Sequence, residues 1–175
     1  AARLEQIEPA QALVRKAATK ADLVVVAMHA GAEGSGATHV PHGTETFLGE
    51  NRGNARAFSH AVIDAGADLV VGSGPHVIRG VERYHGRLIA YSLGNFAGYK
   101  NFGTGGTLSL SAILTVHVRG DGALVGGTWT SLLLDGSALP HLDPSNASAR
   151  LVAQLSREDF GAAAARIAPD GAIRP

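Results

Sequence analysis

Two histidines occupy equivalent places in a repeated pattern. Residues 21–28 (ADLVVVAM) run directly into His29, and residues 67–75 (ADLVVGSGP) run directly into His76. A neutral imidazole is a ligand for divalent metals and a general acid or base, so both histidines are candidate metal-binding and catalytic residues. Each run is short, apolar and rich in β-branched residues, which predicts a strand buried on both faces of a parallel sheet. Since such sheets bind ligands at the carboxyl edge, we expect the two imidazoles to converge there within a few ångströms.

Two histidines make only half of a metal site, because zinc or manganese normally takes at least three protein ligands. Glu33 lies four residues after His29, and the small residues between them allow its carboxylate to fold back toward that imidazole. Asn95 follows another expected strand end, where its amide could orient a substrate or stabilise a turn. His39 and His42 lie in a polar loop, in which solvated side chains are the simpler interpretation. For a single isolated histidine, a hydrogen bond to a neighbouring carbonyl is favoured over a metal.

The elements that must position these residues alternate in type. The spacing of apolar residues predicts a helix over 9–20, a strand ending at His29, a helix that Asn54 caps, and a strand over 68–72. Between the first strand and the second helix, residues 30–52 are Gly-rich and polar, which predicts a long loop. The order of elements is typical of an α/β fold with a parallel βαβ first half.

The second half of the chain has a different pattern. His85-Gly86 predicts a hairpin turn, and alternation over 108–118 followed by Asp121-Gly122 predicts two further antiparallel strands. A last helix is expected over 147–156. Residues 1–160 are therefore expected to form one domain, and residues 161–175 a weakly ordered tail.

Composition excludes several classes of function. The 175 residues include 15 basic and 15 acidic ones, without a basic run, so we expect no nucleic-acid partner. Cysteine is absent, which excludes disulfides, thiolate nucleophiles and Cys-ligated zinc. No apolar run approaches the roughly 20 residues that cross a bilayer, so no membrane span is expected in this chain.

Five motifs stand in a specific order: HAGAE at 29–33, IDAGADLVVG at 63–72, GPHV at 74–77, ERY at 82–84 and YSLGNF at 91–96. Together they closely resemble the bacterial CapA family of capsule-synthesis proteins, which is associated with poly-γ-glutamate. The family's fold is similar to that of the calcineurin-like metallophosphoesterases. The resemblance implies that residues 1–160 are the carboxyl-terminal part of a four-layer α/β/β/α sandwich with a metallophosphoesterase-type pocket.

The resemblance also implies roles for residues. His29 and His76 stand where the superfamily places metal-binding histidines, and Glu33 and Asn95 match positions that line the pocket. The expected cofactor is a divalent metal, Mn or Zn, with Fe as a further possibility. Two features depart from the pattern: Gly74 replaces the first histidine of a paired motif, and the family's amino-terminal half has no counterpart. We expect that half to be needed, and metal binding by this chain alone to be weak.

The resemblance leaves three functions open. The first is a role in the biosynthesis or export of capsule or poly-γ-glutamate, in which the pocket recognises an anionic polymer. The second is a metal-dependent phosphoester hydrolase unrelated to capsule, which would polarise a phosphoester substrate and supply a hydroxide. The third is an inactive fragment. By resemblance, the expected location is the bacterial cell envelope or another extracytoplasmic site.

Overall fold

A computed structural model describes residues 4–101 and 103–175. The elements, in chain order, are α1 (Ile7–Ala18), β1 (Val25–His29), β2 (Glu45–Phe47), β3 (Glu50–Gly53), α2 (Ala55–Asp64), β4 (Leu69–Ser73), β5 (Val81–Tyr84), β6 (Arg87–Ala90), η1 (Gly106–Ser109), β7 (Leu110–Val118), β8 (Leu124–Leu134), β9 (Pro140–Leu142), α3 (Ala147–Phe160), η2 (Gly161–Ala163), β10 (Arg166–Ile167) and β11 (Ala172–Arg174).

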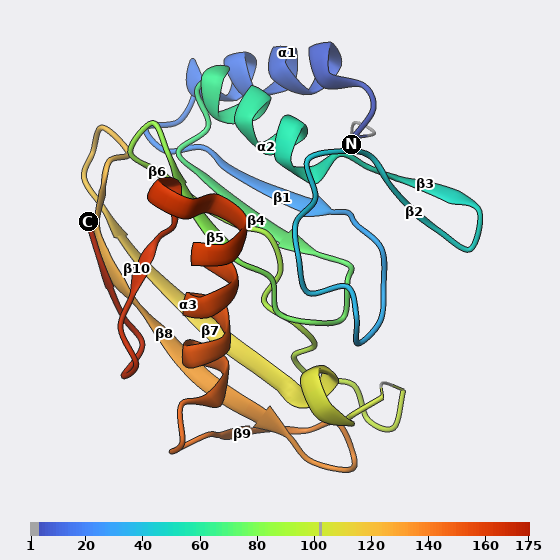
Figure 1. Cartoon of the computed structure of the whole chain (residues 1–175). Coiled ribbons are helices and arrows are strands. Elements are labelled where there is room, and N and C mark those ends of the chain that lie inside the picture. The colour runs from blue at the N-terminus through green and yellow to red at the C-terminus, as the bar shows by residue number, and fades with distance from the viewer. Residues whose placement is uncertain (1–3, 102) are drawn as a thin grey trace.

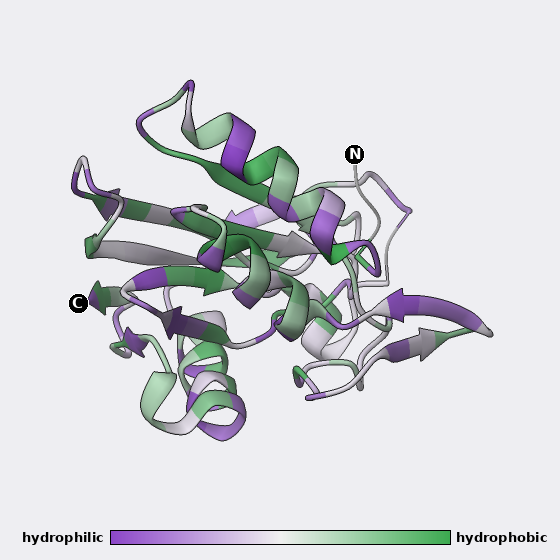
Figure 2. Ribbon diagram, turned by 90° about the horizontal axis from the view of Figure 1, so that it is seen from above, coloured by the Kyte–Doolittle hydropathy of each residue, from purple (hydrophilic) through white to green (hydrophobic). Residues whose placement is uncertain are grey.

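The first sheet has the strand order β1-β4-β6-β5. Its first three strands are parallel, and β5 pairs antiparallel with β6 through the predicted turn at His85-Gly86. Helices α1 and α2 cover one face of this sheet (Figure 1). They pack there because buried residues such as Val14 and Phe58 recur at helical spacing, and Figure 2 shows hydrophobic bands along α1 beside hydrophilic ones. As predicted, Asn54 caps α2, its side-chain oxygen accepting a hydrogen bond from the Ala57 N–H at 2.9 Å.

The two strands of the repeat differ in burial. Val70 of β4 is fully buried, as expected for a central strand of a parallel sheet. In contrast, β1 is the edge strand, and its Val25 is 60 % exposed. The prediction that both strands are buried on both faces is therefore wrong for β1, because its residues alternate between exposed and more buried, so only one of its faces is covered.

The second sheet is antiparallel, with the order β10-β11-β8-β7 and with β9 paired to β8. Trp129 lies on the inner face of β8 and is completely buried. It donates a hydrogen bond to Ser148 of α3 at 3.0 Å. The same core contains residues of the first sheet, such as Leu88, so α3 and the second sheet pack together on the side opposite α1 and α2. On the outer face of β7, Ile113 and His117 are exposed. The fold is thus mixed α/β, parallel first and antiparallel later, as predicted.

Two segments are more ordered than the sequence indicates. The expected loop over 30–52 contains the β2–β3 hairpin, which projects from the body of the molecule (Figures 1 and 2). The expected weakly ordered tail over 161–175 instead forms η2, β10 and β11, and β11 pairs with β8. That prediction is wrong because Ile167 and Ile173 are buried in the second core, which local periodicity over two or three residues does not reveal.

Within the described residues, no helix combines the length and apolar character that crossing a bilayer requires.

The start of α3 depends on a carboxylate, which makes its stability sensitive to acid. Asp143 accepts hydrogen bonds from the Ser145 N–H at 2.9 Å, the Ser145 hydroxyl at 2.6 Å and the Ala147 N–H at 2.8 Å. Burial alone would raise the pKa of Asp143, but these hydrogen bonds outweigh it and hold the pKa below its ordinary value of 3.8.

A depressed pKa in the folded state predicts a definite pH dependence. The contribution of Asp143 is fully present above the unfolded pKa and is lost as the pH falls through the folded one. We therefore expect the free energy of unfolding, measured in urea, to fall less between about pH 6 and about pH 3 in Asp143→Asn than in the wild type. Ser145→Ala, which removes one of the donors, should have an intermediate dependence. An identical pH dependence in all three proteins would contradict this role.

Candidate functional site

The two similar segments that lead to His29 and His76 both end at the carboxyl edge of the parallel strands. His29 is the last residue of β1 and lies opposite Ser73, the last residue of β4. The Ser73 hydroxyl donates to the Met28 carbonyl at 3.3 Å, so it can accept a hydrogen bond from His29 Nδ1, also at 3.3 Å. His76 follows three residues after β4, in the turn that leaves the same edge.

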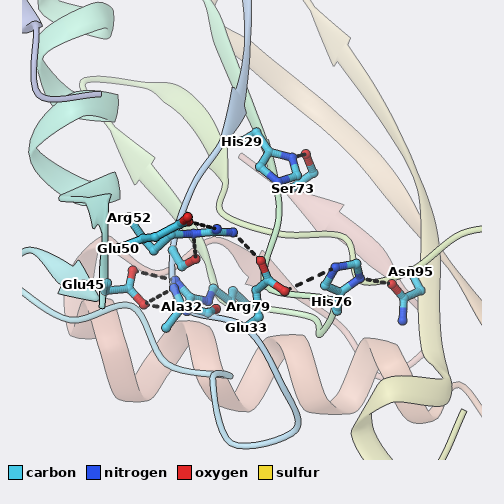
Figure 3. Close-up of polar contacts among 11 residues, drawn as sticks. His29, Ala32, Glu33, Glu45, Glu50, Arg52, Ser73, His76, Arg79 and Asn95 are labelled. Carbon is cyan, nitrogen blue, oxygen red and sulfur yellow. Dashed lines mark hydrogen bonds and ion pairs between the residues drawn. The ribbon is translucent and has the colours of Figure 1, made fainter. Parts of the chain in front are cut away.

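A connected line of polar side chains crosses this edge (Figure 3). Arg52 of β3 forms an ion pair with Glu33 through Nη2 and Oε1, and Arg52 Nε donates to the Gly31 carbonyl at 3.2 Å. The other Glu33 oxygen lies 3.8 Å from His76 Nε2. His76 Nδ1 in turn lies 2.7 Å from Asn95 Oδ1. We call Glu33, Arg52, His76 and Asn95 the edge site.

Asn95 fixes the orientation of the His76 ring. Its side chain is nearly buried, and its Nδ2 donates to the Leu108 carbonyl at 3.4 Å, which leaves Oδ1 facing the imidazole. An amide oxygen only accepts hydrogen bonds, so His76 Nδ1 carries the proton. Nε2 is consequently the ring atom that His76 presents to Glu33. The Ser111 hydroxyl also donates to the Asn95 carbonyl, which holds the backbone at this point.

The turn between β4 and His76 has a backbone that favours glycine. Gly74 has φ of +120°, and a Cβ there would lie 3.0 Å from the Ala30 carbonyl oxygen and 3.3 Å from His29 Cδ2. His76 itself has φ of +63°, in the left-handed region that L-residues rarely adopt. A side chain at position 74 would therefore require both strain and a shift of β1. This gives a structural reason for the Gly74 departure noted from the sequence.

A buried ion pair holds the loop that carries Glu33. Arg79, 1 % exposed, donates to the two Glu45 oxygens at 2.9 and 2.7 Å. It also donates to the Ala37 carbonyl at 2.7 Å and to the Ala32 carbonyl at 3.3 Å. Glu45 accepts from the Ala32 N–H at 3.1 Å. Residues 31–37 are thus fixed from two sides, which sets the position of Glu33.

His29 and His76 line different hollows of this edge. A hollow of about 630 Å³ is lined by His29 together with Glu50, Asn51 and Arg52. A second one, of about 250 Å³, is lined by Glu33, His76 and Asn95. Glu33 does not fold back toward His29 as the sequence suggested: it lies against Arg52 and His76, because the loop crosses toward the end of β4.

The donor set for a metal is incomplete in the part of the chain that the structure describes. Those residues contain no group of three or more His, Cys, Asp or Glu side chains that could hold an ion. In addition, Arg52 already neutralises the Glu33 carboxylate. The residues present therefore do not fit a divalent metal by themselves. The catalytic and metal-binding roles of His29, His76 and Glu33 stay predictions.

Sequence reasoning missed three of the residues that build this edge. Arg52, Arg79 and Glu45 belong to no motif of recognisable spacing, and the only signal in the sequence is the charge of Arg79 among apolar neighbours. His39, a candidate ligand, lies instead against Asp159 of α3, with Nδ1 2.7 Å from Oδ1. It therefore ties the loop to α3 and takes no part in the edge site.

The chain matches the family model described as "Bacterial capsule synthesis protein PGA_cap" over residues 3–100. The chain therefore belongs to this family of bacterial capsule synthesis proteins. The matched range contains the first sheet and every residue of the edge site, whereas β7, β8 and α3 lie beyond it.

Comparison with individual proteins agrees. The chain is 34 % identical over 111 residues to the "PGA biosynthesis protein CapA" of Bacillus subtilis, covering 63 % of this chain and 25 % of that protein. It is 34 % identical over 121 residues to the "Capsule biosynthesis protein CapA" of Bacillus anthracis, covering 69 % of this chain and 25 % of that one. A 41-residue stretch is 58 % identical to the uncharacterized protein y4sH of Sinorhizobium fredii, covering 23 % of this chain and 9 % of that protein. The aligned part of the chain spans a quarter of the length of the two CapA proteins.

Proposed function

We propose that this chain acts in the biosynthesis or export of an anionic capsule polymer of the poly-γ-glutamate type at the bacterial cell envelope, and that the edge site contacts the polymer. The observation that carries the proposal is the coincidence of the family match, over residues 3–100, with all four residues of that site. The names of the two Bacillus relatives supply the class of polymer.

The chemistry of the edge site suits a chain of amides and carboxylates. Poly-γ-glutamate has amide N–H and C=O groups and one carboxylate in each repeat. Arg52 can pair with a carboxylate, and the Glu33 oxygens can accept from an amide N–H. Because Glu33 and Glu50 already lie against Arg52, the site is not a simple well of positive charge. It therefore favours a ligand with donors as well as acceptors.

A metal-dependent phosphoester hydrolase is the second candidate. It is favoured by the position of His29 and His76 at the ends of two adjacent parallel strands. The four-layer sandwich, its metallophosphoesterase-type pocket and a bound Mn, Zn or Fe ion belong to this proposal, together with an amino-terminal half that supplies further ligands. The described residues do not complete a metal site, so hydrolysis requires those further ligands.

Polymer binding tests the first proposal. Arg52→Gln and His76→Ala each remove one member of the edge site, and each is expected to weaken the binding of poly-γ-glutamate about tenfold in titration calorimetry, as the loss of a charged hydrogen bond does. The control is His117→Ala, an exposed histidine on the outer face of β7, which should bind as the wild type does.

Adding a chelator separates the two candidates. Binding that persists in EDTA, without hydrolysis of phosphoesters, supports the polymer-handling role. Binding or hydrolysis that requires added Mn²⁺ or Zn²⁺ supports the second candidate. Wild-type affinity in both edge-site variants would contradict any role of the edge site in binding the polymer.

A further inference from the structure

Three arginines gather at the carboxyl-terminal end of α3, away from the edge site. Arg157 lies in the last turn of that helix, while Arg166 and Arg174 are directly opposed residues of β10 and β11. All three line a single hollow of about 660 Å³. In Figure 1, β10 lies beside α3 and close to the C-terminus. We call this the arginine hollow.

The charge of the arginine hollow is not compensated by any residue that the structure describes. Across residues 4–101 and 103–175, no hydrogen bond or ion pair engages any of the three guanidinium groups, and all three side chains are exposed. The nearest acidic residues in sequence are engaged elsewhere: Asp159 accepts from His39 and Val40, Glu158 accepts from Gln154, and Asp170 accepts from the Ala172 N–H in the turn between β10 and β11. In a chain with net charge zero, this is a local concentration of three positive charges.

The opposition of Arg166 and Arg174 is itself unfavourable. Like charges that face each other across an antiparallel pair destabilise it, and an anion between them would relieve the repulsion. The remaining lining is made almost wholly of small residues, among them Gly161, Ala162, Ala164 and Ala168. No bulky side chain fills the hollow, so an extended ligand can reach the guanidinium groups.

From these observations we infer that the arginine hollow is a second binding site for a polycarboxylate chain, separate from the edge site. Planar guanidinium groups pair with carboxylates through two parallel hydrogen bonds, and several such pairs in one hollow suit a polymer with a carboxylate in every repeat. The identity of the polymer rests on the proposed function. The hollow itself lies outside the residues matched by the family model.

The test measures binding of a short synthetic γ-glutamate oligomer by titration calorimetry at low salt. The double variant Arg166→Gln/Arg174→Gln is expected to bind about tenfold more weakly than the wild type, because two charge-assisted pairs are lost. The matched control, Arg15→Gln/Arg83→Gln, removes two exposed arginines elsewhere and should stay within about twofold of the wild type. An oligomer whose carboxylates are converted to amides should not bind to the hollow.

Thermal unfolding adds a second readout, in which the measurement without ligand does not depend on the edge site. Without ligand, the double variant should unfold at the same or a higher temperature than the wild type, since a repulsion is removed. The oligomer should then raise the unfolding temperature of the wild type more than that of the variant. A variant that unfolds at a lower temperature without ligand, and is stabilised equally by the oligomer, would overturn the inference.

The outcomes separate this inference from the proposed function. Wild-type affinity in Arg166→Gln/Arg174→Gln, with loss in His76→Ala, overturns the arginine hollow and leaves the edge site standing. Wild-type affinity in His76→Ala, with loss in Arg166→Gln/Arg174→Gln, overturns the edge site and supports the hollow. Equally strong displacement of the oligomer by polyphosphate would overturn the assignment to carboxylates. A wild type that binds no oligomer at all would overturn both.

Discussion

Replacing Arg79 with methionine is expected to lower the free energy of unfolding by about 3–5 kcal/mol, the usual cost of leaving one member of a buried ion pair alone. Both partners are nearly inaccessible, with side chains 1 % and 8 % exposed for Arg79 and Glu45. Without Arg79, the Glu45 carboxylate keeps the hydrogen bond from the Ala32 N–H, which does not compensate its burial. Urea denaturation followed by circular dichroism measures this loss.

The same substitution should loosen the loop that carries Glu33. Arg79 donates to the carbonyls of Ala32 and Ala37, so amide exchange over 31–37 is expected to accelerate. The double variant Arg79→Met/Glu45→Met removes both charges and should be more stable than Arg79→Met alone. The surface control is Arg119→Met, which breaks an exposed pair with Asp121 and should cost less than about 1 kcal/mol. Equal losses in Arg79→Met and Arg119→Met would show that the buried pair does not hold the loop.

Gly72→Ala is expected to have the second largest effect, about 3 kcal/mol of destabilisation, at the upper end of the cost of overpacking a core. A Cβ at Gly72 would lie 2.1 Å from the Tyr91 carbonyl oxygen and 3.0 Å from Met28 Cε. The first of these contacts is with backbone, so β4 and the segment after β6 must move apart to accommodate a methyl group. The loss is measured by urea denaturation.

The displacement from Gly72→Ala should also reach the edge site. Gly72 precedes His76 by four residues, and Tyr91 precedes Asn95 by four, so separating the two segments lengthens the contact between His76 and Asn95. A changed ring-proton NMR signal of His76 would report this. Gly36→Ala is the matched control, because a Cβ there meets no atom within 4 Å and its φ is not positive. A Gly72→Ala variant as stable as Gly36→Ala would contradict the close approach of β4 to Tyr91.

Local patterns in the sequence predicted the elements that depend on contacts between residues close together in the chain. The Asn54 cap depends on a contact with Ala57 only three residues away, and the turn at His85-Gly86 depends on residues between two short strands. The parallel pairing of β1 with β4 was also predictable, since two similar apolar runs separated by a helix favour that arrangement. The family followed from several motifs in a fixed order, and the comparisons confirm it.

Pairings between distant side chains were not predictable in this way. Arg79 and Glu45 are 34 residues apart, and neither belongs to a periodic pattern that marks it as buried. Glu33 was expected to turn toward His29, yet it lies against Arg52 and His76. The β2–β3 hairpin decides this, because it brings Arg52 back across the loop. Its strands are too short for alternation to be recognised in the sequence.

The apolar repeat specifies which segments are strands and in which direction they run, so the sequence is enough to place two histidines at the carboxyl ends of neighbouring parallel strands. Three features follow only from the packing of the whole chain: His29 and His76 line separate hollows, Arg52 neutralises Glu33, and a tail without clear periodicity completes the second sheet. The periodicity of a segment indicates which of its faces is buried. The path of a loop depends on the packing of the whole chain around its two cores, and so do the contacts that its side chains make.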